Sequence, residues 1–266
     1  MGADTKSLRT RIRSVDSTLH LTKAMGLVAS SKIRRATQNM GKSREYTAAL
    51  EEVMEQLRSS PDCAKSPYMT AKGPGTRIIV IAGDRGLAGG YNANVFRLAA
   101  EFEGASFLPI GKRACDRFGE GFLSAERFSG TEAAQVADAE CRAFLAGEFE
   151  RLGILYTRYQ NMMTLTAEML WVLPLEKHAG GKTTPTIFEP GEREVLDAAV
   201  PTYVSGLVAA CVRESFASEV AARRMAMDSA GKNAQEMIDK LQLQYNRARQ
   251  NAITQEITEI VAGSGM

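Results

Sequence analysis

Apolar residues recur every three or four positions along the first sixty residues of the chain. Fifteen positions spaced alternately four and three apart run from Leu8 to Leu57, and eleven of them are apolar. No proline interrupts the pattern before Pro61. The four exceptions are small residues, which let a neighbouring backbone approach: Thr22, Gly26, Ser43 and Thr47. A heptad pattern sustained over this length predicts a helix that pairs with another helix as a coiled coil.

A second heptad pattern occupies the other end of the chain. Ten positions from Val220 to Ala252 follow the same spacing, eight of them are apolar, and no proline occurs after Pro201. The apolar positions then shift to Ile253, Ile257 and Ile260, which predicts a local change of supercoil rather than a break in the helix.

The two predicted helices are too long to fit inside a compact chain of this size. A helix of about 50 to 55 residues spans about 75 to 80 Å at about 1.5 Å per residue. A compact chain of 266 residues is only about 45 to 50 Å across. We therefore expect the terminal helices, residues 1–60 and 201–262, to pair with each other as an antiparallel coiled coil.

The middle of the chain, residues 75–190, reads as a small Rossmann-like α/β domain inserted between the helices. Short β-branched runs alternate with helical segments in this region. The predicted strands are 77–82, 106–110, 153–159 and 164–173, and the predicted helices are 93–102, 112–118 and 132–150. Segments rich in Pro, Gly and Ser at 61–75, and a second stretch at 178–185, read as a linker and a loop.

Charge is distributed unevenly, although the chain as a whole carries only +2. Residues 6–35 hold a single acidic side chain, Asp16, and the following basic side chains: Lys6, Arg9, Arg11, Arg13, Lys23, Lys32, Arg34 and Arg35. Such a strip fits an acidic partner, which could be nucleic acid, anionic lipid or an acidic protein. A solvated helix face is the plainer interpretation of the same charges.

The remaining composition argues against several classes of protein. No run of about 18 consecutive apolar residues is present to span a bilayer, and the N-terminus lacks a signal-peptide core, so a cytoplasmic location is expected. Cys63, Cys115, Cys141 and Cys211 lie far apart, which favours reduced structural thiols. With only His20 and His178 besides, a zinc site cannot be assembled locally, and a nucleophilic catalytic site is poorly supplied although one His would suffice for it, so we expect no catalytic residue, cofactor or metal.

Two segments resemble phosphate-binding loops. Residues 36–43, Ala-Thr-Gln-Asn-Met-Gly-Lys-Ser, fit a relaxed P-loop, but Ala36 and Met40 belong to the heptad pattern, so the expected context is a helix. Residues 83–92, Gly-Asp-Arg-Gly-Leu-Ala-Gly-Gly-Tyr-Asn, lie between a predicted strand and helix, where anions commonly bind. The plainer interpretation is a tight turn that needs positive φ at Gly86, Gly89 or Gly90.

Three stretches together resemble the gamma subunit of F-type ATP synthases. The first is Ile12-Arg-Ser-Val, Leu21-Thr-Lys-Ala-Met and Val28-Ala-Ser-Ser-Lys-Ile-Arg-Arg-Ala, and the second is Asp84-Arg-Gly-Leu-Ala-Gly-Gly-Tyr-Asn. The third begins at Glu214-Ser-Phe-Ala-Ser-Glu-Val-Ala-Ala-Arg and continues through Tyr245-Asn-Arg-Ala-Arg-Gln to Ile253-Thr-Gln-Glu-Ile-Thr-Glu-Ile-Val. The resemblance runs almost from end to end and is weakest between about residues 103 and 150.

The resemblance implies a central-stalk rotor that catalyses nothing itself. In that family the paired helices pass through a ring of alpha and beta subunits, and the α/β domain meets the epsilon subunit and the c-ring. The rotor couples ion translocation to ATP synthesis or hydrolysis as a peripheral protein on the cytoplasmic face of the cell membrane, with membrane association only through the complex. The resemblance places coupling contacts at these residues: Lys23, Met25, Lys32, Arg34, Arg35, Arg223, Gln250, Thr254 and Glu256.

The principal alternative is a basic coiled-coil protein that binds nucleic acid, but interleaved aromatic residues for that role are missing. The sequence departs from the family at Gly26, where an acidic residue is common, and in the tail from Ala262 to Met266. It does not identify the coupling ion as a proton or sodium, the preferred direction of operation, or any regulatory inhibition.

Overall fold

The computed structural model describes residues 2–177 and 186–263, and the chain divides into two compact units. One unit consists of Met1–Ala29 together with Arg224–Met266, and the other is Ser30–Arg223. The loop predicted at 178–185, which includes His178, lies outside the described residues.

Both terminal segments form long helices, as the heptad patterns predict. Helix α1 runs Gly2–Ser59 and helix α5 runs Glu192–Gly263, with 58 and 72 residues. Helix α5 begins earlier than the prediction, because Pro201 lies inside the helix and does not start it. The proline gives up one backbone hydrogen bond, but Leu196 and Val200 on the preceding turns are fully buried, and their burial favours the longer helix.

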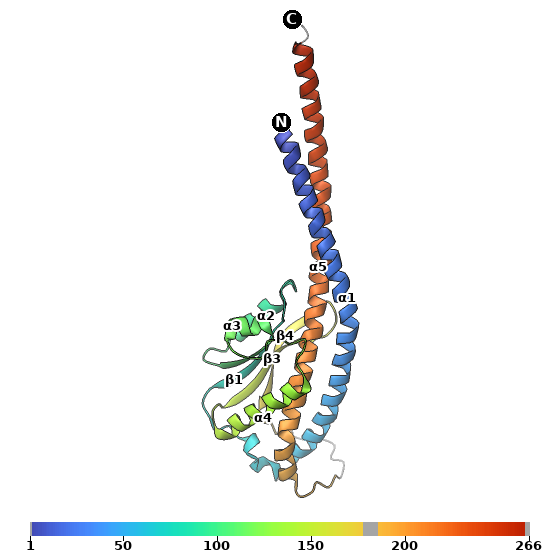
Figure 1. Ribbon diagram of the computed structural model, residues 1–266. Coiled ribbons are helices and arrows are strands. Elements are labelled where there is room, and N and C mark those ends of the chain that lie inside the picture. Colours follow the sequence, from blue (N-terminus) through green and yellow to red (C-terminus); the bar gives the residue numbers. More distant parts are fainter. Residues whose placement is uncertain (1, 178–185, 264–266) are drawn as a thin grey trace. The chain divides into compact units, whose positions relative to one another are not determined.

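In the unit of the terminal segments, α1 and α5 run antiparallel (Figure 1). Leu19 of α1 packs with Ala234 and Ile238 of α5 in a small apolar cluster. Further along, the Cα of Gly26 faces Met227, and a Cβ built on Gly26 would lie 3.7 Å from the Met227 Cβ. All fifteen heptad positions of α1 are buried or half-buried, so the predicted seam is confirmed.

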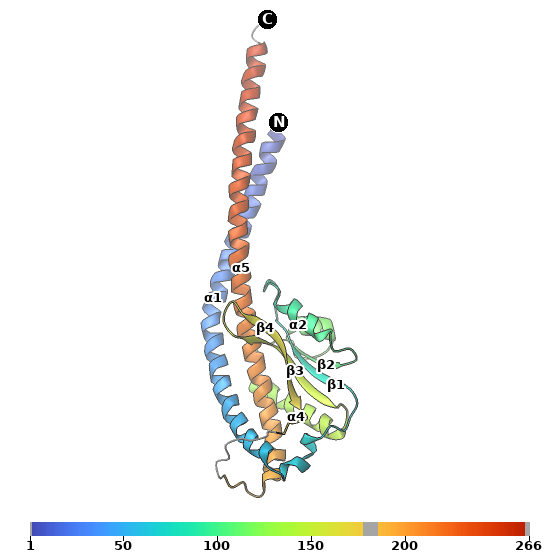
Figure 2. The same cartoon turned by 180° about the vertical axis from the view of Figure 1, so that it is seen from behind.

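Helix α5 continues unbroken past Ala252, as predicted, but the apolar positions predicted to continue the seam there are not buried within the chain. Ile253, Ile257 and Ile260 are 47%, 56% and 69% exposed. The physical reason is visible in Figures 1 and 2, where the C-terminal end of α5 continues past the N-terminal end of α1 and so has no helix beside it.

The unit Ser30–Arg223 contains a mixed sheet of four strands. The strands are β1 (Thr76–Ile81), β2 (Ser106–Ile110), β3 (Arg151–Tyr159) and β4 (Leu165–Leu173). Their order is β2-β1-β3-β4, with β1 parallel to β2 and β3, and with β4 antiparallel to β3 (Figure 2). The helices of this unit, besides parts of α1 and α5, are α2 (Tyr91–Ala99), α3 (Lys112–Phe118) and α4 (Gly130–Ala146).

Alternate residues of the strands face two different apolar layers. Ile78 and Val80 of β1 pack with α2 and α3 on one face of the sheet. Ile79 and Ile81 pack on the other face with α4, with the first turns of α5 and with the end of α1. Because helices cover both faces of the sheet, the four residues 78–81 of β1 are fully buried although they alternate between the faces. The predicted fold class, an antiparallel helix pair with an inserted Rossmann-like α/β domain, is confirmed.

The segment after α1 is more ordered than the linker predicted for 61–75. It forms two short 3₁₀ helices, Cys63–Lys65 and Pro67–Met69, and Cys63 and Tyr68 are buried in the main core. Ser66 caps the second of these helices, since its side chain accepts a hydrogen bond from the Tyr68 amide.

Helix α5 contains one stretch apolar enough, by length and composition, to cross a membrane, with a mean hydropathy of 1.7 and 44% of the stretch buried. The sequence contains no uninterrupted apolar run of that length, so consecutive apolar residues alone do not reveal this stretch. The apolar part of α5 packs against the sheet, where Val204, Val208 and Val212 are buried, so the core of the α/β unit accounts for this composition. All four cysteines are free thiols, as expected.

Candidate functional site: a basic groove beside the glycine-rich loop

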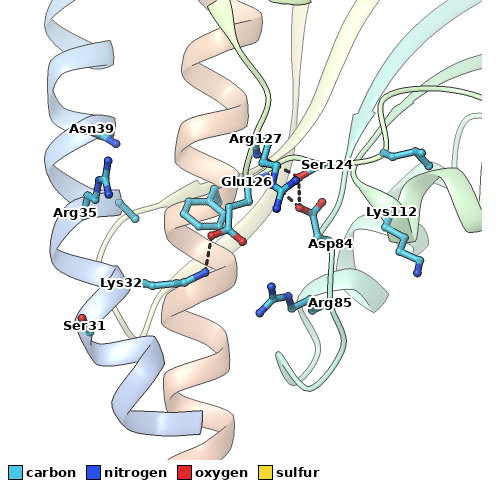
Figure 3. A pocket seen from close by; sticks show the side chains of 13 residues that line it. Ser31, Lys32, Arg35, Asn39, Asp84, Arg85, Lys112, Ser124, Glu126 and Arg127 are labelled. Carbon is cyan, nitrogen blue, oxygen red and sulfur yellow. Dashed lines mark hydrogen bonds and ion pairs between the residues drawn. The ribbon is translucent and has the colours of Figure 1, made fainter.

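An open groove of about 850 Å³ lies where α1 passes the glycine-rich loop 83–92 (Figure 3). Five segments of the unit Ser30–Arg223 contribute to it: α1, the loop, the start of α3, the stretch 123–127, and α5. The lining residues with charged side chains are Lys32, Arg35, Asp84, Arg85, Lys112, Glu126 and Arg127.

The groove carries a surplus of positive charge, because its two carboxylates are already engaged inside the chain. Asp84 accepts hydrogen bonds from the Ser124 hydroxyl at 2.6 Å and from the Ala125 amide at 2.7 Å. Glu126 pairs with Lys32, with 2.5 Å between the Lys32 Nζ and the Glu126 Oε1. Among the described residues, the other four cations of the groove have no carboxylate partner: Arg35, Arg85, Lys112 and Arg127. All four of these side chains are exposed to solvent.

The glycine-rich loop is fixed to α5 by a buried ion pair. Arg223 pairs with Glu219 on the preceding turn, at 2.5 Å, and its guanidinium donates hydrogen bonds to the Gly86 and Arg85 carbonyl oxygens. Glu219 is 2% exposed. Burial raises the pKa of the Glu219 carboxyl, while the Arg223 guanidinium opposes that rise.

The backbone of the loop approaches α5 closely at Gly83 and is left-handed at two residues. A Cβ on Gly83 would lie 2.8 Å from the Glu219 Cδ, so the buried pair has room only beside a glycine. Gly89 has a φ of 57°, which confirms the predicted positive φ at that glycine. The other left-handed residue is Leu87, with a φ of 61°, and neither Gly86 nor Gly90 takes this conformation.

The second phosphate-loop match carries no site. Residues 36–43 are helical within α1, where Ala36 and Met40 pack against Ala217 of α5. A helical backbone directs its amides into its own hydrogen bonds, so they cannot surround a phosphate group. The expectation of a helix here is confirmed.

The structure brings some of the predicted coupling residues together. Lys32 and Arg35 line the basic groove, and Arg223 lies at its edge, holding the loop that carries Arg85. Arg34 is exposed on α1 outside the residues that line the groove. Sequence reasoning missed Asp84, Glu126 and Glu219 as members of this site. Glu219 had a signal, since it lies four residues before Arg223 on one helix, but nothing in the sequence marks the pairing of Glu126 with Lys32.

The other predicted coupling residues belong to the unit of the terminal segments. Lys23 is exposed and lines a smaller pocket of about 470 Å³ with Met227 and Lys232, and Met25 is half-buried. Near the end of α5, Gln250, Thr254 and Glu256 are exposed. Lys23 therefore lies beside the α5 residues near 230, and not beside the group at 250–256.

These features define a class of protein: a chain whose two terminal helices pair, with an inserted α/β domain that presents a basic groove. Within the described ranges 2–177 and 186–263, no group of His, Cys, Asp and Glu side chains could hold a metal ion. The family model for ATP synthase matches residues 4–265.

The chain is 41% identical to the ATP synthase gamma chain of Ruminococcus albus, over 98% of each chain. It is 37% identical to the sodium-ion-specific gamma chain of Acetobacterium woodii, over 99% of each. Its fold matches a chain of the rotor of the mitochondrial ATP synthase from Euglena gracilis, with a TM-score of 0.68, 18% identity, and coverage of 95% of this chain and 100% of that one. The chain belongs to the ATP synthase gamma chain family.

Membership of this family makes the chain a non-catalytic subunit of the central stalk of a rotary ATP synthase. It also places the chain in a membrane-associated complex. The nucleic-acid-binding alternative is not favoured, since both the sequence relatives and the fold point to the stalk.

Proposed function

We propose that this chain is the turning element that couples ion translocation through a c-ring to ATP synthesis or hydrolysis in a head of alpha and beta subunits. The observation that carries the proposal is the sharing of two continuous helices by both units. Helices α1 and α5 each contribute residues to the α/β unit and to the terminal unit. A torque applied to either unit is then carried by unbroken helical backbone.

Each expected domain has its own place in the proposed complex. The paired helices, residues 1–60 and 201–262, lie inside the head of alpha and beta subunits. The α/β domain, residues 75–190, meets the epsilon subunit and the c-ring on the cytoplasmic face of the membrane. Relatives support this arrangement, since the solved neighbours include a central stalk with a c-ring from Tetrahymena thermophila. The chain is then a peripheral membrane protein that touches the bilayer only through its complex.

The groove cations are the proposed contact for an acidic segment of the beta subunits. Arg35 of α1 and Arg85 of the loop lie on the same open groove without carboxylate partners among the described residues. Exposed charges at such a contact attract an acidic segment over several ångströms but bind it weakly, because water screens them. Weak, multiple contacts suit a surface that must form and release them in every turn.

We also propose partner contacts at the remaining coupling residues. Arg34 extends the basic surface along α1, and Lys23 with Met25 does so in the terminal unit. The exposed polar side chains Gln250, Thr254 and Glu256 near the end of α5 offer a second contact to the head. Lys32 and Arg223 already have partners inside the chain, Glu126 and Glu219.

The test is co-expression of the chain with its cognate alpha and beta subunits. Particles are isolated by size, their subunit ratio is measured, and their ATP hydrolysis is compared with that of preparations lacking this chain. The proposal expects one copy of this chain in each particle and hydrolysis that depends on it. Alpha and beta subunits that assemble and hydrolyse ATP equally well without the chain would contradict it.

A further inference from the structure

Arg223 of α5 and Lys32 of α1 bind two different segments of the α/β domain, the glycine-rich loop and the stretch 124–126, and these two segments bind each other. On the α5 side, the Arg223 guanidinium donates to the Gly86 carbonyl oxygen at 3.2 Å. The Gly83 amide in turn donates to the Asn92 side chain at 2.9 Å, which closes the base of the loop. Residues 83–86 are therefore held on both sides.

From the loop, the contacts continue to the stretch 124–126. The Asp84 carboxylate accepts hydrogen bonds from the Ser124 hydroxyl and from the Ala125 and Glu126 amides. The Glu126 side chain then pairs with Lys32 on α1, a residue 94 positions away in the sequence. Figure 3 shows both steps, with Asp84 directed at the 124–126 backbone and Lys32 extended toward Glu126.

We infer that these contacts form a continuous polar relay, from Glu219–Arg223 on α5 through Asp84 to Glu126 and Lys32 on α1, which locks the α/β domain to both helices. This inference rests on the proposed function, because the lock matters only if the chain carries torque. Asp84, Glu126 and Glu219 are then positioning residues of the rotor. Lys32 acts on Glu126 of its own chain and not on a partner subunit.

The relay fixes the domain because its hydrogen bonds, unlike apolar contacts, have a preferred direction. The α/β domain also packs on α1 and α5 through apolar side chains such as Met54, Leu57 and Val204. Apolar burial contributes much of the stabilisation, but the hydrophobic effect itself has no preferred direction. Charge-assisted hydrogen bonds lengthen and weaken as soon as the groups shift, and they therefore fix the domain against rotation about the helix pair.

Charge reversal tests the α1 end of the relay in the membrane-embedded complex. The variants are Lys32→Glu, Glu126→Lys and the double variant that exchanges the two charges, with Arg142→Glu as a matched control on an exposed site of α4. The measured quantity is the number of ions pumped per ATP hydrolysed. Each single reversal is expected to lower this ratio roughly threefold, and the exchange is expected to restore it, as for a directly coupled pair.

The exchange separates the relay from the alternative in which Lys32 binds an acidic partner. In that case the double variant would pump no better than Lys32→Glu alone, and this result would overturn the inference. A failure of the proposed function gives another result: the unmodified chain would then neither enter the complex nor change its rate of ATP hydrolysis.

Hydrogen exchange in the full chain supplies a second test that does not depend on pumping. In Asp84→Ala the Ala125 and Glu126 amides lose their side-chain acceptor, and their exchange should speed up roughly tenfold or more relative to the unmodified chain. Arg142→Glu should leave both amides unchanged. Equal exchange rates at these amides in Asp84→Ala and in the unmodified chain would remove the central link and with it the relay.

Discussion

Arg223 and Glu219 form an ion pair one turn apart on α5, and it is buried against the backbone of the glycine-rich loop. The Glu219 side chain is 3% exposed and that of Arg223 is 13% exposed. The Arg223 guanidinium donates to this carboxylate and to two backbone carbonyl groups of the loop. Arg223 therefore holds the backbone of the glycine-rich loop in place through contacts within its own chain.

The first prediction concerns the loss of this pair. Arg223→Ala leaves a buried carboxylate without its cation, and breaking a buried pair in this way costs about 3 kcal/mol. Removal of the cation raises the pKa of Glu219 further above its ordinary value of 4.5. A carboxyl with a raised pKa binds a proton more readily in the folded state, so the stability of the variant should fall as pH rises above 4.5.

Urea unfolding of the α/β unit at pH 5 and pH 8 measures this loss. The deficit of Arg223→Ala relative to the unmodified chain should be larger at pH 8. The double variant that adds Glu219→Gln should recover part of the deficit at pH 8 and lose its pH dependence. A deficit of equal size at both pH values would show that the Glu219 charge is not its cause.

The second prediction compares two glycines. In Gly83→Ala the new Cβ would approach the Glu219 Cδ to 2.8 Å, and the buried pair has little room to move. Overpacking of this kind costs about 1 to 3 kcal/mol. Gly41→Ala is the control, since Gly41 lies inside α1 with nothing within 4 Å of a new Cβ. Alanine there should stabilise the helix by about 0.5 to 1 kcal/mol.

Denaturant midpoints of the two glycine variants provide the measurement, and they should move in opposite directions. A Gly83→Ala chain as stable as the unmodified one would mean that Glu219 does not occupy the space beneath the loop.

The third prediction concerns Gly26, where the family commonly has an acidic residue. A Cβ at Gly26 would meet the Met227 Cβ at 3.7 Å and the Arg224 Nη1 at 3.8 Å, which are ordinary contact distances. Alanine therefore fits, and Gly26→Ala should raise the melting temperature of the paired helices by a gain of about 1 kcal/mol. Circular dichroism at a helical wavelength follows this transition, and a lowered melting temperature would show that the helices need the glycine for a closer approach.

The fourth prediction tests the groove as a contact for an acidic partner. Arg35→Glu combined with Arg85→Glu should lower the ions pumped per ATP hydrolysed by roughly threefold, since both cations attract the partner and neither has an acid of its own. Added salt screens exposed charges, so it should narrow the difference between the variant and the unmodified chain. The charge-matched reversal Arg142→Glu should pump normally. An identical loss in Arg142→Glu would indicate an effect of net charge and not of the groove.

The sequence predicted those parts of the fold that depend on local periodicity. Heptad spacing from Leu8 to Leu57 identified the buried face of α1, and the β-branched run near Ile79 identified a central strand. The start of α5 was missed because Pro201 normally ends a helix, whereas here the burial of Leu196 and Val200 outweighs the lost hydrogen bond. At Ile253 the apolar pattern predicted a buried seam, but the side chain is exposed. An apolar pattern predicts a buried face only where another helix lies beside it.

The site was predicted in part, for a related reason. The basic strip along α1 is visible in the sequence, and so is the unusual glycine content of 83–92. Which cations remain free is decided by tertiary contacts: Lys32 is neutralised by Glu126, while Arg35, three residues later, is not. Sequence spacing cannot distinguish two cations of one strip when the neutralising acid comes from a distant loop.

Rotation of the chain inside its complex can be observed directly. Met163, at the turn between β3 and β4, is 82% exposed, so Met163→Cys in a Cys115→Ser background offers one accessible thiol for a visible probe. The head is immobilised through its beta subunits, and the probe is followed by microscopy. The account predicts continuous turning in one direction that requires ATP and stops when ATP is removed. Particles that hydrolyse ATP while the probe stays fixed would contradict it.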